Sequence, residues 1–310
     1  MTAGRARTVF VGSGAFGRPS LERLHDHPDI ELVGVVTAPP KTAGRRQHVR
    51  PTPIADAAAK LGIERVLAPP RLRSRDAVGE VLALEPDLLV LADYGQTVPA
   101  ELLEPVYGTL NVHPSLLPRH RGATPVPAAI LAGDRETGVT LLRMDAGVDT
   151  GPIVAQEAVG LQGDETAPDL EARLAELGAD LLGDTLAGWL RGEIEPRPQP
   201  TEGVSITRPL RREDGRLDPG RPADELERQV RAYQPWPGSF VDTSEGRLIV
   251  WVAQVASSGP PQGAFDAGGL GTAGGGGLRL IEVQPAGGKR MTWDAYVRGH
   301  PAIVGASIVG

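Results

Sequence analysis

The sequence of 310 residues contains no cysteine, which excludes disulfide bonds, thiolate nucleophiles and cysteine-ligated zinc or iron–sulfur centres. No apolar run is long enough to cross a membrane, and residues 1–8 lack the apolar stretch of a secretory signal. We therefore expect a cytoplasmic protein that does not bind membranes. Aromatic residues make up only 4% of the chain, so aliphatic side chains must fill the core. The formal charge of −7 restricts any contact with RNA to a local patch.

Apolar runs alternate with stretches of helical spacing up to about residue 190. The expected strands are 8–12, 31–37, 87–92, 109–112 and 137–144, and the expected helices are 16–25, 53–61, 75–84, 123–132 and 170–190. This alternation predicts an α/β fold, with a Rossmann-like, mostly parallel sheet that carries helices on both faces.

Three alternating prolines, Pro196, Pro198 and Pro200, predict a stiff extended connector after the long helix. We therefore expect three parts in the chain, which are a catalytic domain at 1–190, a linker at 191–207 and a smaller domain at 208–310.

In the smaller domain, a helix at 222–233 and strands at 247–255 and 278–283 predict a small, OB-like β-barrel. The segment 259–277 is crowded with glycine and has few side chains to pack, so we expect a mobile loop there.

Asn111, His113 and Asp149 have the residue types of an acyl-transfer site. Asn111 and His113 are two residues apart, so on a strand both side chains point to the same face and can meet one developing oxyanion. A carboxylate from the glycine-rich segment 145–151 can orient the imidazole, or raise its pKa and keep it protonated. Taken singly, the same residues fit a core histidine, a turn asparagine and a capping aspartate, and their combination favours catalysis.

A glycine motif at 12–17 (GSGAFG) matches the dinucleotide fingerprint, so an oxidoreductase has to be considered. The second strand ends in Val36-Thr37-Ala38 without the carboxylate that holds the ribose, so we expect no NAD. A tight turn from strand to helix explains the glycines equally well. The pair His25 and His27 has no third partner, and we expect no metal.

A cationic stretch follows the second predicted strand. It contains Lys41, Arg45, Arg46 and Arg50, and it lacks apolar periodicity. A solvated surface loop is one interpretation. The other is a mobile basic loop at the sheet edge that contacts a phosphate backbone.

Residues 111–122 (NVHPSLLPRHRG) resemble the signature of the folate-dependent formyltransferases, and the segments 133–140 and 149–151 continue the match. The resemblance extends to Tyr94-Gly95, and beyond the linker to residues 226–237 and 284–291, so it covers nearly the whole chain. It implies transfer of a formyl group from 10-formyltetrahydrofolate, with Asn111, His113 and Asp149 as the catalytic residues.

The resemblance also assigns binding residues. The cofactor-binding residues that it implies are Tyr94, Gly95, Ser115, Leu116, Leu117 and Pro118. The RNA-binding residues that it implies are Lys41, Arg45, Arg46 and Arg50, to which we add the cations Arg208, Arg211, Lys289 and Arg290. Asp93 departs from the family pattern, because many relatives have a small or apolar residue there.

The C-terminal half is similar to the branch of this family whose amine substrate is methionine carried on initiator tRNA. We therefore expect initiator methionyl-tRNA and folate as partners of a monomeric enzyme. An N-formyltransferase acting on an amino sugar nucleotide or another small amine would share the catalytic half. A non-catalytic RNA-binding protein is a third interpretation, and the intact set Asn111, His113 and Asp149 counts against it.

Overall fold

The computed structural model of the chain describes residues 4–43 and 48–309, which form two compact units. The first unit contains residues 4–125, 136–160 and 171–207, and the second contains 126–135, 161–170 and 208–309. The segment 191–207, which we expected to be a stiff extended linker between the domains, groups with the first unit. Two short segments of the expected catalytic domain group with the C-terminal residues instead.

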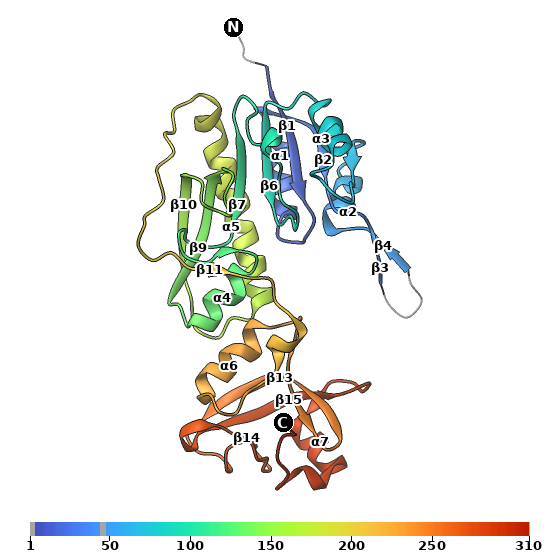
Figure 1. Cartoon of the computed structure of the whole chain (residues 1–310), viewed down its shortest axis with the longest axis vertical. Coiled ribbons are helices and arrows are strands. Elements are labelled where there is room, and N and C mark those ends of the chain that lie inside the picture. Colours follow the sequence, from blue (N-terminus) through green and yellow to red (C-terminus); the bar gives the residue numbers. More distant parts are fainter. Residues whose placement is uncertain (1–3, 44–47, 310) are drawn as a thin grey trace. The chain divides into compact units, whose positions relative to one another are not determined.

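A seven-stranded sheet forms the centre of the first unit, in the order β10-β9-β7-β6-β1-β2-β5 (Figure 1). Its strands are β1 (Ala6–Gly12), β2 (Ile30–Val36), β5 (Val66–Leu67), β6 (Leu88–Ala92), β7 (Thr109–His113), β9 (Glu136–Arg143) and β10 (Ile153–Gly160). The pairs among β1, β2, β5, β6 and β7 are parallel, whereas β9 runs antiparallel to both β7 and β10. The predicted α/β fold with a mostly parallel sheet is confirmed.

Helices cover both faces of this sheet. They are α1 (Arg18–Asp26), α2 (Pro53–Lys60), α3 (Arg75–Leu82) and α5 (Ala167–Leu190), while α4 (Pro125–Ala132) falls largely in the second unit. Val9 and Val11 of β1 share a buried cluster with Val78 and Val81 of α3, so α3 packs on one face. Successive strand residues point to opposite faces, which leaves the alternate residues of β1 for helices on the other side.

Two features position the functional residues. The chain turns from β1 to β2 in one direction and from β6 to β7 in the other, so the carboxyl ends of β1 and β6 lie at a topological switch point. Open α/β sheets bind ligands at such a point. Separately, the short strand β11 (Ile206–Thr207) pairs in parallel with β8 (Arg121–Gly122), which joins the segment 191–207 to the loop that follows β7.

An antiparallel sheet forms the second unit. Its elements are α6 (Ala223–Ala232), β12 (Ser239–Thr243), β13 (Gly246–Ala256), β14 (Gly269–Gly271), β15 (Gly277–Pro285), β16 (Met291–Thr292) and α7 (Trp293–Gly299). The strands pair in the order β12-β13-β15-β14, with β16 also on β15. In the described part of the chain no ladder joins β12 to β14. Leu226 and Val230 of α6 pack into the core of this sheet.

The prediction of a mobile loop without packing side chains at 259–277 is wrong. Gly269–Gly271 forms β14 and pairs with β15, while Phe265 and Leu270 are each only 1% exposed. These two side chains belong to the core of the second unit. Glycine content indicated flexibility, but two well-placed apolar residues are enough to anchor this segment.

Within the described ranges, no helix combines the length and apolar character needed to cross a bilayer.

Candidate active site

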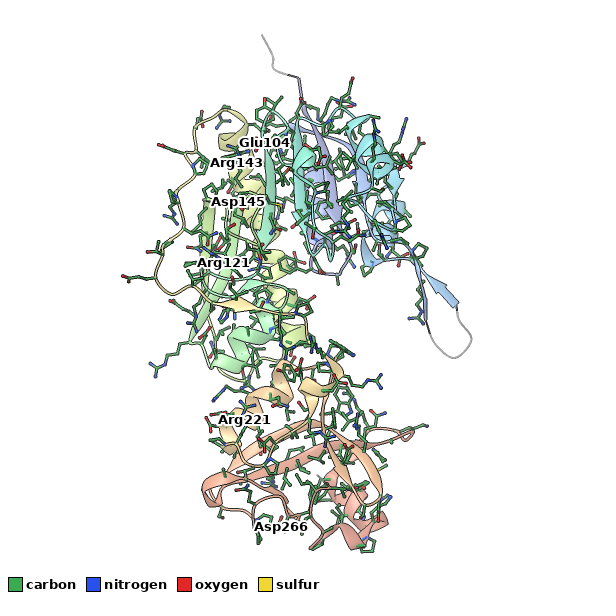
Figure 2. The ribbon with its side chains drawn as sticks, viewed as in Figure 1. Glu104, Arg121, Arg143, Asp145, Arg221 and Asp266 are labelled. Atoms are coloured by element: carbon green, nitrogen blue, oxygen red, sulfur yellow. The ribbon has the colours of Figure 1, made fainter. Side chains whose placement is uncertain are left out.

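Asn111 and His113 are the third and fifth residues of the buried strand β7. All five residues of β7 are buried between β6 and β9, and the two side chains point to the same side of the sheet because they are two residues apart. The third predicted residue, Asp149, lies on the loop between β9 and β10. Figure 2 labels Asp145, which begins this loop, and Arg121, which lies on β8.

The structure brings the three predicted catalytic residues together. Asn111 Nδ2 donates to Asp149 Oδ1 at 3.2 Å, and the backbone N–H of Gly122 donates to Asp149 Oδ2 at 2.8 Å. Asp149 Oδ2 lies 3.7 Å from His113 Nδ1. The Asp149 side chain is 14% exposed and that of His113 only 5%, so both lie where solvent screens charge weakly.

Only a residue without a side chain can occupy position 122. Its φ of +97° is in the left-handed region, and a Cβ there would lie 2.3 Å from the carbonyl oxygen of Thr207. Only glycine combines this backbone with the close approach of β11 while its N–H binds the carboxylate.

The His113 ring has a defined orientation. Nε2 lies 3.0 Å from the carbonyl oxygen of His120, and because a carbonyl can only accept, Nε2 must carry the hydrogen. Nδ1 therefore faces Asp149, and in the neutral ring it has a free lone pair. The sequence did not indicate this tautomer.

Burial lowers the pKa of His113 below the ordinary value of about 6.5, although the Asp149 carboxylate and the His120 carbonyl raise it. The neutral ring is therefore the resting form at pH 7. Of the two effects expected of Asp149, orientation of the ring agrees with this finding, whereas a resting protonated ring does not.

Titration of His113 by proton NMR is expected to give a midpoint below 6.5, and in Asp149→Asn a still lower one, since the charge that raises the pKa is removed. The His113→Asn spectrum assigns the signal among the six histidines. Because the folded-state pKa is depressed, the neutral ring favours folding above pH ~6.5, and this contribution is lost as the pH falls through the folded pKa. A wild-type midpoint above 6.5 would contradict the assignment.

Polar groups of the turn 115–118, which follows β7, form hydrogen bonds within the protein. Ser115 Oγ donates to the carbonyl of Arg119, Thr140 Oγ1 donates to the carbonyl of Ser115, and the N–H of Leu117 donates to Thr140 Oγ1. Ser115, Leu117 and Pro118 are buried, and Leu116 is half-buried. Of the four residues expected to bind cofactor here, Leu116 is the one that is not fully buried.

The loop after β6 is more accessible. Gly95 is exposed, and the Tyr94 hydroxyl is buried without a hydrogen-bond partner in the described structure. Burial raises the pKa of Tyr94 to about 12, so the hydroxyl keeps its proton and can donate. Asp93 is exposed as a residue, but its carboxyl group lies against Gly14, and desolvation there raises its pKa above the ordinary value.

The glycine motif at 12–17 meets the end of β6. A Cβ on Gly12 would lie 2.5 Å from the carbonyl oxygen of Ala92, and one on Gly14 would lie 1.5 Å from Asp93 Oδ2. Close packing of the β1–α1 turn on β6 thus accounts for these glycines. This agrees with the interpretation of the motif as a tight turn.

Two of the expected RNA-binding residues, Lys41 and Arg50, lie on two short paired strands. β3 (Lys41–Ala43) pairs antiparallel with β4 (His48–Arg50), so both segments are regular strands, where we expected only a loop. Arg45 and Arg46 lie outside the described residues, as does the side chain of Lys41, while Arg50 is exposed.

The four cationic residues of the second unit that we expected to contact RNA differ in their surroundings. Arg208 makes a bidentate pair with Asp214, and Arg290 lies 3.7 Å above the ring of Trp251. Arg211 and Lys289 are exposed.

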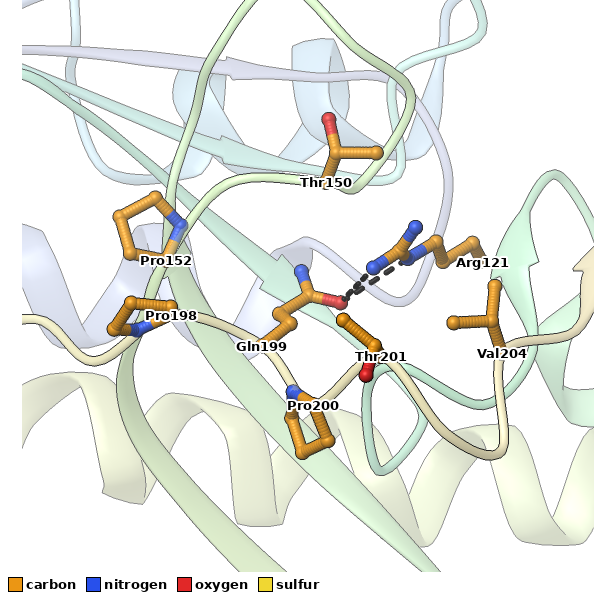
Figure 3. A pocket seen from close by; sticks show the side chains of 8 residues that line it. All are labelled: Arg121, Thr150, Pro152, Pro198, Gln199, Pro200, Thr201 and Val204. Carbon is orange, nitrogen blue, oxygen red and sulfur yellow. Dashed lines mark hydrogen bonds between the residues drawn. The ribbon is translucent and has the colours of Figure 1, made fainter.

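Gln199, in the proline-rich segment, was missed by the sequence analysis. Its Nε2 donates to the carbonyls of Asp149 and Gly151, both at 2.7 Å, and its Oε1 accepts from Arg121 Nε and Nη2 at 3.1 and 2.7 Å. Figure 3 shows the contact between Arg121 and Gln199 in a pocket of about 530 Å³, lined by residues 198–201 and Val204 together with Thr150 and Pro152. A glutamine between two prolines was the only signal in the sequence.

Comparison with protein-family models identifies the family of the chain. The formyl transferase family model matches residues 6–186, and the model of the formyl transferase C-terminal domain matches residues 209–301. The chain belongs to the formyl transferase family.

Within the family, the chain is similar along its length to proteins named methionyl-tRNA formyltransferase. That of Halorhodospira halophila is 41% identical over 98% of this chain and 99% of its own length, and that of Myxococcus xanthus is 40% identical over 97% of each.

Solved structures share the fold. HypX from Aquifex aeolicus with tetrahydrofolic acid has a TM-score of 0.61 at 18% identity, over 95% of this chain, which spans about half (47%) of HypX. The sugar 3N-formyltransferase WlaRD gives 0.63 at 15%, over 90% of this chain and 98% of its own. Glycinamide ribonucleotide transformylase 1 from Symbiobacterium toebii gives 0.51 at 26%, over 63% and 94%.

Proposed function

We propose that this protein transfers the formyl group of 10-formyltetrahydrofolate to the α-amine of methionine on initiator tRNA, and so acts in the initiation of translation. The observation that carries the proposal is the contact between Asn111, His113 and Asp149 at a buried strand end. The similarity to methionyl-tRNA formyltransferases along the whole chain, including the second unit, supports the choice of substrate.

Asn111 is suited to stabilise the negative charge that develops on the formyl oxygen when the amine attacks. One hydrogen of its amide binds Asp149, and the other has no protein partner among the described residues. The amide is held in place before the reaction by this bond and by burial, so it can donate to the oxyanion without reorganisation.

His113 is suited to move the proton. Its neutral Nδ1 takes up the proton that the attacking amine releases, and the charged ring is then stabilised by Asp149 Oδ2 at 3.7 Å. The ring returns this proton to the folate nitrogen as its bond to the formyl carbon breaks, either directly or through a water. One proton is thus taken up and given back in each turnover.

The folate, which supplies the formyl group, would lie between the loop after β6 and the loop 145–151. The half-buried Tyr94 and the exposed Gly95 fit a ligand at this place, and Leu116 offers an apolar contact. Asp93 adds a carboxyl group at the rim, which suits the N–H groups of a heterocycle. The loop after β6 leaves the carboxyl-end edge of the parallel strands, where such folds bind ligands, and the loop 145–151 brings Asp149 to Asn111 and His113 of the neighbouring strand.

The tRNA would meet the cationic stretch 41–50, with Lys41, Arg45, Arg46 and Arg50 as phosphate contacts, and exposed cations of the second unit such as Arg211 and Lys289. We also propose that the protein is a cytoplasmic monomer, as expected from the sequence. Light scattering of the purified protein at assay concentration tests the monomer.

The proposed function is tested by incubating the protein with 10-formyltetrahydrofolate and methionylated initiator tRNA. Formyl-methionyl-tRNA should form with the charged tRNA, and no product should form with uncharged tRNA or free methionine. A nucleotide-linked amino sugar is the decisive alternative substrate. If the amino sugar is formylated and the charged tRNA is not, the alternative N-formyltransferase function is correct. If neither amine is formylated while tRNA still binds, the non-catalytic interpretation replaces both.

A further inference from the structure

Gln199 forms hydrogen bonds with the backbone of the loop that carries Asp149, the candidate catalytic carboxylate. Its amide donates to two carbonyls of that loop, those of Asp149 and Gly151, and receives two donors from Arg121. Four hydrogen bonds thus meet on one half-buried side chain, which the chain supplies from a segment about 50 residues beyond Asp149 in sequence.

The orientation of this amide is determined by its neighbours. A guanidinium can only donate and a backbone carbonyl can only accept, so Oε1 must face Arg121 and Nε2 must face the loop. A flipped amide would oppose like groups at all four contacts. Arg121 therefore sets the direction in which Gln199 donates.

Asp149 needs such support because its backbone is unfavourable. Its φ of +50° lies in the left-handed region, which is uncommon for residues with a Cβ, although aspartate adopts it more often than most, so contacts that hold the backbone there stabilise this conformation. Asp145 ties the start of the loop to Thr150, because its Oδ1 accepts from the N–H of Gly147 and from Thr150 Oγ1. Gln199 fixes the end that carries the carboxylate.

We propose that Gln199 is a positioning residue, which sets the distance between the Asp149 carboxylate and His113 by holding the backbone of residues 149–151. This inference rests on the proposed function of Asp149 and His113. Gln199 acts on the reaction through Asp149 alone, so its loss should reduce kcat and leave KM for both substrates nearly unchanged.

Gln199→Glu is the sharpest variant. The glutamate has nearly the same shape and still accepts from Arg121, but it cannot donate to the two carbonyls and places negative charge against them. We expect kcat to fall by about 10- to 100-fold, because a displacement of about 1 Å in a catalytic group has an effect of this size. Gln162→Glu adds the same charge at an exposed glutamine and should leave kcat unchanged.

A double-mutant cycle separates positioning from general damage. In an Asp149→Asn background, Gln199→Glu should lower kcat by about twofold or less, because the carboxylate that it positions is already absent. An equal loss in the wild-type and Asp149→Asn backgrounds would overturn the proposal.

A neutral variant, Gln199→Met, provides a readout that needs no turnover. With the carboxylate displaced, the NMR midpoint of His113 should move down, toward that of Asp149→Asn, while the circular dichroism spectrum stays that of the wild type. An unchanged midpoint in a folded Gln199→Met protein refutes positioning. If the wild type forms no formyl-methionyl-tRNA, the proposed function fails, while the titration still decides the role of Gln199.

Discussion

Replacing His113 with asparagine is expected to lower kcat for formyl transfer by about 10²- to 10⁴-fold, the range for loss of a general acid–base group. Asparagine is shorter than histidine and its amide nitrogen corresponds in position to Nδ1, so the contact between Nε2 and the carbonyl of His120 is lost together with the ring. What it lacks is a group that takes up and returns a proton. Because proton transfer belongs to the transition state, KM for charged tRNA and folate should change little.

The measurement is steady-state formylation of methionylated initiator tRNA, with His25→Asn as the control. His25 is an exposed histidine on α1, outside the site, and its replacement should leave kcat unchanged. Asp149→Asn should also lower kcat, since the charged ring formed during transfer loses its stabilising carboxylate. If His113→Asn retained more than about a tenth of the wild-type kcat, the proton path would have to run through another group.

Asn111, His113 and Asp149 were predictable from sequence because short-range rules position them. Asn111 and His113 are separated by the two-residue repeat of a strand, and a glycine-rich segment carries Asp149 back toward that strand. The mostly parallel sheet was predictable for a similar reason, as each strand or helix reveals its type within a few residues. Burial of the turn 115–118 was not predictable, because the N–H of Leu117 and the carbonyl of Ser115 are both satisfied by Thr140 on β9, which is distant in sequence.

The tautomer of His113 and the role of Gln199 depend on contacts that no local pattern encodes. The acceptor of Nε2 is a main-chain carbonyl, and any residue type at position 120 provides one. Gln199 reaches the loop only because the segment 198–207 runs back along β8, where β11 pairs with it. Alternating prolines indicated an extended segment and left its destination undetermined.

The prediction of a mobile loop at 259–277 failed for a different reason, which leads to a second prediction with a large expected effect. Composition averaged over the segment hid Phe265, which is 1% exposed and lies 5.9 Å from the Trp293 ring, centroid to centroid. Its backbone is also fixed, since its N–H donates to the carbonyl of Ala306 and its carbonyl accepts from Gly305. One buried aromatic side chain anchors a stretch that is otherwise mostly glycine and small residues.

Phe265→Ala is therefore expected to lower the unfolding free energy of the second unit by about 3–5 kcal/mol, the cost of removing a buried phenylalanine and leaving a cavity. The measurement is urea denaturation followed by tryptophan fluorescence in a Trp189→Phe background. Three tryptophans, Trp236, Trp251 and Trp293, then remain, and all lie in the second unit. The signal thus reports on that unit alone.

Val255→Ala is the control, because Val255 is an apolar residue of β13 that is 53% exposed, and its truncation should cost about 0.5 kcal/mol or less. The contrast between the two variants separates a packed segment from a mobile one. If 259–277 were mobile, Phe265 would be solvated in the folded protein, and its loss would resemble that of Val255. A cost below about 1 kcal/mol for Phe265→Ala would restore the interpretation of a mobile loop. A cost of several kcal/mol would show that Phe265 holds β14 and the following glycine turn in the core.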